Sequence, residues 1–111
     1  MSESVVDPQA LISIFGDNTS AQVSILQKFV TQTDELIADF DVAFEQHDAG
    51  QIMFHAHKFK SSARTVGANQ LADLCFALEQ AGREEDWDVI NSLSPDLLPA
   101  VEQVRQYVNG L

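Results

Sequence analysis

The chain has 111 residues, of which 45% are hydrophobic, and this is enough for one compact domain to bury a core without a metal or a disulfide. Its six Lys and Arg residues stand against seventeen Asp and Glu residues, which gives a formal net charge of -11. Affinity for nucleic acid or anionic lipid rests on clustered positive charge, so this balance argues against both kinds of partner. We expect a single domain over residues 1–111, with a core from about residue 7 to residue 108.

The cysteine count and the N-terminal residues bear on the cellular compartment. Cys75 is the single cysteine and sits in an apolar run, so we interpret it as a small core residue and expect no thiolate metal site. The N-terminus lacks the basic start and apolar stretch of a signal peptide, and no apolar run reaches the roughly 18 residues of a membrane span. The sequence therefore predicts a cytoplasmic protein, and we expect it to be a monomer that does not bind membranes.

Apolar residues recur at helical spacing along almost the whole chain, and no stretch shows the alternation of a β-strand, which predicts an all-α protein. Asp7 as N-cap and Pro8 at the first helical position open a short helix that Gly16 can close. Its apolar residues are Leu11, Ile12, Ile14 and Phe15. We expect this helix to pack across one end of a helical bundle.

The second predicted helix begins near Thr19 or Ser20 and runs until residues 47–50 break it. At about 1.5 Å per residue it is roughly 40 Å long. His47 lies in the break, so we interpret it as part of the helix end.

The third predicted helix runs from about Asp48 or Gln51 to Val66 and ends at Gly67. The fourth follows after a very short turn, from Asn69 to about residue 81, where Gly82 closes it. So short a connection makes the third and fourth helices antiparallel neighbours.

The acidic run of residues 84–86 predicts a solvated turn before the last helical region. That region starts with apolar residues around Trp87, and we then expect a helix with Ser94 as N-cap and Pro95 at its first position. Pro99 predicts a kink or a new start within it.

The third helix places a histidine outside its apolar face. With Phe59 at zero and about 100° per residue, four other small or apolar residues fall within roughly 60°: Ile52, Ala56, Ala63 and Val66. His57 lies roughly 140° from the centre of this stripe, in a solvent-facing sector that it shares with Lys60, Ser61 and Arg64. A role for His57 in the core is therefore excluded.

Met53 and Phe54, one turn before His57, also fall toward this outer sector. Large apolar side chains normally leave water where the fold allows it. Two interpretations stay open: both residues belong to a docking surface beside His57, or they fill a corner under the N-terminal helix.

These residue types suit the transfer of a phosphoryl group through a histidine. Neutral imidazole is a competent nucleophile near pH 7, and the loose transition state of phosphoryl transfer asks the protein for positioning and nearby positive charge. Lys60 can supply that charge, and the small Ser61 keeps the surface open and can bond a phosphoryl oxygen. Glu79 on the fourth helix is a candidate to hold the Nδ1 proton of His57, although an ordinary surface position is an equal alternative.

At this point the sequence resembles the histidine-containing phosphotransfer (HPt) domains. Their pattern is an Ala-His pair, an apolar residue, Lys, small residues, an apolar-Gly-Ala turn, and then Leu, Cys and Leu-Glu on the next helix. The matching residues are Ala56, His57, Phe59, Lys60, Ser62, Ala63, Val66, Gly67, Ala68, Leu71, Cys75, Leu78 and Glu79. The resemblance implies an up-and-down four-helix bundle with a short additional N-terminal helix.

The resemblance also implies a function. His57 would accept a phosphoryl group from a receiver-domain phosphoaspartate or a kinase and pass it to another response regulator, with Lys60 assisting and Glu79 contacting the ring. The partners implied are receiver domains of response regulators and a hybrid sensor histidine kinase, docked over Met53, Phe54, Ser61 and Arg64. Mg²⁺ is expected only in the partner receiver domain, so this chain needs no cofactor and no metal. Ser61 departs from the family pattern, which usually has glycine there, and it could slow transfer.

The spacing of the glycines bears on whether the chain could be a kinase. The five glycines are scattered, without a Gly-rich nucleotide-binding segment, so we expect a stoichiometric phosphocarrier rather than a kinase. A non-transferring helical adaptor that binds a receiver or kinase is the alternative.

A metal- or haem-binding bundle would need inward-facing ligand pairs, and His55 and His57 diverge by about 200° on a helix. The starting methionine favours a free-standing carrier over a domain excised from a larger kinase.

Overall fold

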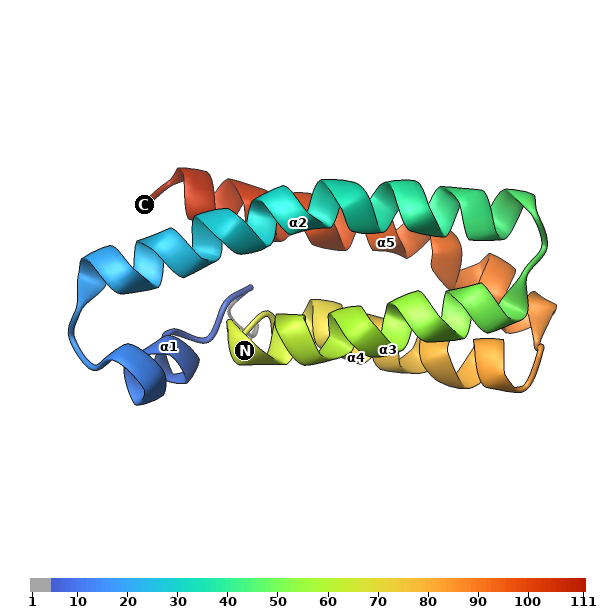
Figure 1. Ribbon diagram of the computed structural model, residues 1–111, viewed down its shortest axis with the longest axis horizontal. Helices are drawn as coiled ribbons and strands as arrows, with labels where there is room; N and C mark the ends of the chain where they lie inside the picture. Colours follow the sequence, from blue (N-terminus) through green and yellow to red (C-terminus); the bar gives the residue numbers. More distant parts are fainter. Residues whose placement is uncertain (1–4) are drawn as a thin grey trace.

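The computed structural model describes residues 5–111 and consists of helices joined by short turns. Residues 1–4, which belong to the single domain predicted over 1–111, lie outside the described residues. The helices are α1 (Pro8–Phe15), α2 (Thr19–Glu45), α3 (Ala49–Thr65), α4 (Asn69–Arg83) and α5 (Trp87–Asn109). Helices α2 to α5 run up and down as a four-helix bundle, and α1 lies at one end, as Figure 1 shows. The all-α prediction and the predicted bundle are confirmed.

The first helix forms where the sequence predicted it. The side chain of Asp7 accepts a hydrogen bond from the backbone N–H of Gln9, and Gly16 takes a φ of 61° as α1 ends. The helix packs against α2 and α3. Only Leu11 of its apolar residues is buried, whereas Ile12 and Ile14 remain exposed. A helix this short touches the bundle along one narrow line, and therefore covers only part of its apolar surface.

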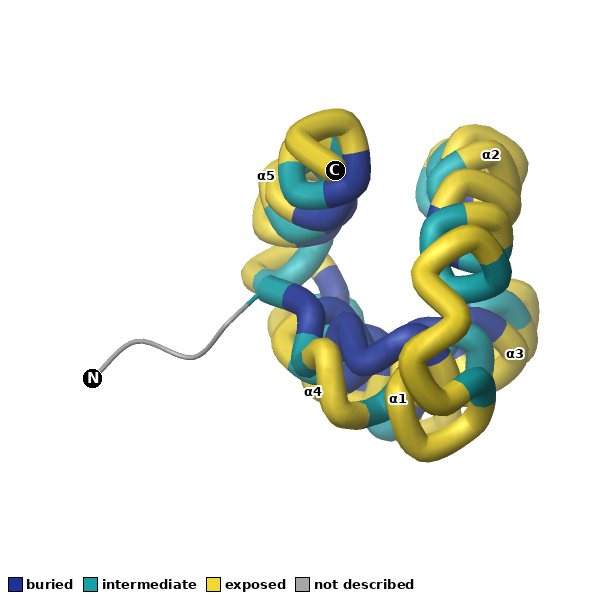
Figure 2. Tube along the Cα trace, turned by 90° about the vertical axis from the view of Figure 1, so that its left-hand side faces the viewer, coloured by how far each residue is buried: buried dark blue, intermediate teal, exposed yellow. Residues whose placement is uncertain are grey.

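The helices enclose one core, and Figure 2 shows buried residues in dark blue toward the middle of the bundle. Helix α3 contributes Ile52, Ala56 and Ala63, each with an exposed fraction of 0%, and Phe59, whose ring lies 5.1 Å from that of Phe29 on α2. The helical wheel therefore identified the core-facing side of α3 correctly. The small alanines let the neighbouring helices approach closely, and α3 packs most extensively against α4.

Gly82 does not close α4, as the sequence had predicted, because the helix continues to Arg83. The glycine is buried at the α3–α4 contact instead. A Cβ atom there would lie 2.8 Å from the backbone nitrogen of Met53 and 2.9 Å from the carbonyl oxygen of Ala49. Gly82 is therefore needed for the close approach of two helices rather than for a turn.

The last region is one helix from Trp87 to Asn109, and the predicted start at Ser94 is wrong. Asp86 is the N-cap, and its side chain accepts a hydrogen bond from the backbone N–H of Val89. Pro95 and Pro99 both lie inside the helix. The hydroxyl of Ser94 donates to the carbonyl oxygen of Ile90, so it serves the helix interior and caps nothing. Figure 1 shows α5 bending before the part that runs beside α2, as prolines within a helix favour.

Candidate functional site

His57 lies on the outer surface of α3, as the sequence predicted. Its side chain is 65% exposed, while Ala56 and Phe59 on either side are buried in the core. The buried neighbours fix the rotation of α3 and therefore the direction in which the imidazole points. The ring is presented to solvent from a rigid helix.

Glu79 reaches this ring from α4. Its side chain is only 4% exposed, and its Oε2 atom lies 3.1 Å from Nδ1 of His57. The interpretation of Glu79 as an ordinary surface residue is therefore wrong. An ionised carboxylate only accepts hydrogen bonds, so Nδ1 is the donor and Nε2 keeps its lone pair, directed away from Glu79.

Lys60 differs from its predicted position. Its Nζ atom donates to Oε1 of Glu79 at 2.8 Å and lies 5.2 Å from the centre of the Phe76 ring, so only 19% of its side chain is exposed. The placement of Lys60 in the solvent-facing sector of α3 was wrong because a helical wheel of one helix omits its neighbour. Helix α4 covers that flank of α3 and brings Glu79 and Phe76 against Lys60.

Sequence analysis missed a third basic residue, Arg83. Its Nη2 atom donates to Oε2 of Glu79 at 3.1 Å, the same oxygen that His57 contacts. The signal was present, since Arg83 follows Glu79 by four residues on one helix and such pairs face each other. We call His57, Lys60, Glu79 and Arg83 the carboxylate cluster.

The environment of Glu79 keeps its carboxylate ionised. Burial raises the pKa of this carboxyl, but the hydrogen bonds from Lys60 and His57 and the positive charge of Lys60 lower it by more, so the pKa lies below its ordinary value. Cys75, one turn earlier on α4, is buried, and burial raises the pKa of its thiol to about 12 against the opposing charge of Lys60. Glu79 is therefore a carboxylate in this region, and the thiol of Cys75 stays protonated.

The predicted docking residues lie on α3, Met53 and Phe54 before His57 and Ser61 and Arg64 after it. Phe54 is exposed, and Met53 is half-buried with its backbone against Gly82. The alternative that both residues fill a corner under α1 is wrong, because α1 meets the opposite end of α3, where the backbone N–H of Asp7 donates to the carbonyl oxygen of Gly67. Phe76 on α4 is a second exposed aromatic that the sequence analysis did not single out.

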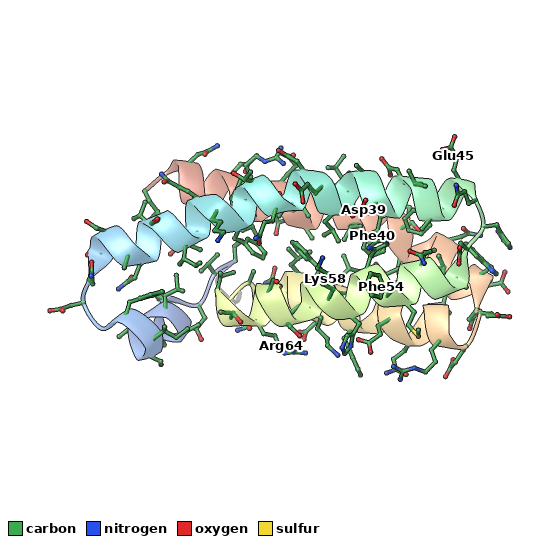
Figure 3. All side chains as sticks on the ribbon, viewed as in Figure 1. Asp39, Phe40, Glu45, Phe54, Lys58 and Arg64 are labelled. Carbon is green, nitrogen blue, oxygen red and sulfur yellow. The ribbon has the colours of Figure 1, made fainter. Side chains whose placement is uncertain are left out.

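Ser61 and Arg64 are exposed on the same helix as His57. Arg64 pairs with Asp73 of α4 at 3.6 Å, and Figure 3 shows it on the edge of α3 away from α2. Lys58, although adjacent to His57 in sequence, lies on the other side of α3 and lines a groove between α2 and α3. Lys58 therefore lies apart from Lys60 and Arg64, which face α4.

Two other kinds of site are absent from the described residues. Within residues 5–111, no three His, Cys, Asp or Glu side chains are grouped so as to hold a metal ion. No helix of the described part of the chain is long and apolar enough to cross a membrane.

Comparison with known proteins gives two matches. The family model described as the Hpt domain matches residues 24–107. Among solved structures, the chain is similar to histidine-containing phosphotransfer protein B (HptB) from Pseudomonas aeruginosa PAO1, with a TM-score of 0.89 and 24% sequence identity. That match covers 98% of this chain and 95% of the other, and at this identity it shows the fold. A search of the curated proteins finds no significant match.

Proposed function

The chain belongs to the Hpt domain family, and we propose on this premise that it carries a phosphoryl group on His57 between receiver domains of a phosphorelay. The family performs histidine phosphotransfer in two-component signalling, as a carrier rather than as a kinase. The observation that supports His57 as the acceptor is its exposed ring, held at Nδ1 by a buried carboxylate.

In the proposed reaction, Nε2 of His57 attacks the phosphorus of a receiver's aspartyl phosphate. The Nε2–P bond forms while the P–O bond to the aspartate breaks, and the electron pair of that bond leaves with the carboxylate. Glu79 fixes the tautomer in which the Nε2 lone pair faces outward. Lys60 sits one turn from His57, and its flexible chain can move its ammonium from Glu79 to a phosphoryl oxygen. The chain supplies no Mg²⁺ in this scheme, and the receiver brings its own.

The surface around His57 suits an acidic partner with an apolar contact. Lys60, Arg64 and Arg83 gather half of the six basic residues of the chain around this histidine, although the net charge is -11. A receiver's phosphoaspartate site is acidic, so opposite charges would steer the two domains together. The exposed rings of Phe54 and Phe76 supply apolar area for contact, and Met53 and Ser61 complete the proposed docking surface.

A transfer assay tests the function. The protein is incubated with a phosphorylated receiver domain, and acid-labile, base-stable label is followed on the chain. We expect label on the wild type and on His55→Gln, a matched variant of the neighbouring histidine, and none on His57→Gln. Absence of label on the wild type, or label that survives His57→Gln, would reject the proposed role.

The same experiment separates the carrier from a non-transferring adaptor. An adaptor would bind the receiver as tightly as a carrier but would never take up label. For the docking surface, we expect Phe54→Ala with Phe76→Ala to weaken the complex about tenfold or more, since exposed aromatics are common binding hot spots. The double variant Val42→Ala with Val89→Ala removes exposed apolar groups from α2 and α5, and serves as the control. Equal dissociation constants for the two double variants would contradict the docking surface.

A further inference from the structure

Lys60 is a charged residue that has lost most of its contact with water, since only 19% of its side chain is exposed. Two groups of α4 take the place of that water. Oε1 of Glu79 accepts a hydrogen bond from Nζ at 2.8 Å, and the ring of Phe76 lies under the same atom, with its centre 5.2 Å away. The face of an aromatic ring attracts a cation, and more strongly where water is excluded. Phe76 is therefore a second attractive partner of the ammonium, beside the carboxylate.

The same ring separates two carboxylates of α4. Asp73, Phe76 and Glu79 follow one another at a spacing of three residues, which is about one helical turn. Across the two helices, Glu79 pairs with Lys60. One turn further along α3, Arg64 pairs with Asp73. The ring of Phe76 thus lies between the two pairs, and it limits the movement of the long, flexible chain of Lys60 toward the exposed Asp73.

The two exposed aromatic residues near His57 differ in what they contact. The ring of Phe54 lies 5.3 Å from the ring of His55, in an edge-on arrangement. The ring of Phe76 contacts the ammonium of Lys60. A docking surface accounts for the exposure of both rings, but it does not account for a charge placed over one of them before any partner has bound.

We propose that Phe76 is a positioning residue for phosphoryl transfer at His57, because its ring holds the ammonium of Lys60 beside Glu79, one helical turn from the imidazole. In this role Phe76 acts through Lys60 and not on the phosphoryl group itself. The negative charge on the phosphoryl oxygens then meets an ammonium that is already nearby and only has to leave Oε1 of Glu79. The proposal rests on the proposed function and adds a role that is separate from docking.

The contact is tested first, by NMR of the unphosphorylated protein. The methylene protons next to Nζ of Lys60 should resonate upfield of those of Lys28, an exposed lysine of α2, because the face of the Phe76 ring shields them. This difference should disappear in Phe76→Leu and remain in Phe76→Tyr, which keeps the ring. Equal shifts for the two lysines in the wild type would overturn the proposal.

The role in transfer is tested with phosphoramidate, a small phosphoryl donor that needs no protein partner. The Nε2–P bond forms while the P–N bond of the donor breaks, and the nitrogen leaves as ammonia with the electron pair. We expect Phe76→Leu to take up label about threefold more slowly than the wild type, and Phe76→Tyr to restore the rate. Because no receiver is present, a loss of docking contacts cannot produce this difference.

Two lysine backgrounds separate positioning from a general disturbance of α4. In Lys60→Ala, the further change Phe76→Leu should have no effect on the rate, since the ring has lost its cation. In Lys58→Ala, which removes a lysine from the α2–α3 groove, Phe76→Leu should have its full effect of about threefold.

Equal labelling rates for the wild type and Phe76→Leu would reject the proposal. An effect of Phe76→Leu that persists in the Lys60→Ala background would also reject it, because Phe76 would then act without the lysine. If phosphoramidate labels His57 but a phosphorylated receiver does not, the proposed function fails, while the effect of Phe76 on labelling is still measured.

Discussion

Two histidines lie two residues apart on α3, and each pairs with a carboxylate in an opposite arrangement. The side chain of His55 is 19% exposed and lies 3.9 Å from Asp39, whose side chain is 56% exposed. The side chain of His57 is 65% exposed and lies 3.1 Å from Glu79, whose side chain is 4% exposed. The covered member is thus the histidine in the first pair and the carboxylate in the second.

The difference in exposure favours the pair of His57 and Glu79 as the proposed reactive pair. The ring of His55 lies beside those of Phe40 and Phe54, so its surface is largely occupied by packing, and its carboxylate is free to move in water. A buried carboxylate, by contrast, has one geometry and acts in a medium where charge interactions are less screened. An exposed ring held by a buried acceptor suits the nucleophile proposed at His57, whereas the ring of His55 is covered.

The largest effect should come from removing the buried carboxylate of Glu79, with removal of Asp39 as the matched control. We expect Glu79→Ala to slow phosphoryl transfer about 100-fold, because the ring loses its fixed tautomer and its charge partner. Asp39→Ala should leave the rate within about twofold, since Asp39 does not touch His57. Rates are measured with a phosphorylated receiver after circular dichroism has shown both variants to be folded. Similar rates for the two variants would remove the contrast between the pairs.

The next effect concerns the two lysines on either side of α3. Lys60→Ala should slow transfer about tenfold by removing positive charge near the phosphoryl group, without unfolding the domain. Lys58→Ala removes the same charge from the α2–α3 groove and should change the rate by less than about twofold. If Lys58→Ala is as slow as Lys60→Ala, the net charge of the chain matters rather than the position of one ammonium.

Acid should weaken the Glu79 pair. The pKa of Glu79 lies below its ordinary value in the folded protein, so its ionisation stabilises the fold above the ordinary carboxyl pKa of about 4.3. That contribution is lost as pH falls through the lower, folded-state pKa. Urea unfolding at neutral and acid pH should therefore show a larger acid loss of stability in the wild type than in Glu79→Gln. Asp39→Asn should lose as much as the wild type, and a loss as small as that of Glu79→Gln would place the acid sensitivity elsewhere.

The smallest effect should be the change in the free energy of unfolding caused by Arg83→Gln. Its side chain is 55% exposed and pairs with Glu79 along one helix, and such pairs contribute only about 0.3–0.5 kcal/mol. Arg83→Gln should therefore change the free energy of unfolding by no more than about 0.5 kcal/mol, as measured in urea. A loss above about 2 kcal/mol would show that Arg83 holds the buried carboxylate in place against its own desolvation.

The sequence by itself determined most of the helices and the outward direction of His57. Apolar spacing and the caps at Asp7 and Asp48 are local features, and the hydrogen bonds of both caps form as their residue types predict. The wheel of α3 placed His57 correctly because its core-facing residues define one direction around one axis. It failed for Lys60, whose surroundings depend on a second helix.

Tertiary structure alone decided how α3 and α4 meet, and therefore what surrounds the histidine. The buried Gly82, read from the sequence as a helix end, lets the two backbones approach closely, and this approach brings Glu79 to Nδ1 and covers Lys60. No spacing along one chain encodes the distance between side chains 22 residues apart, such as His57 and Glu79. That distance follows from the packing of small residues between helices, because helix separation depends on the side chains at the contact.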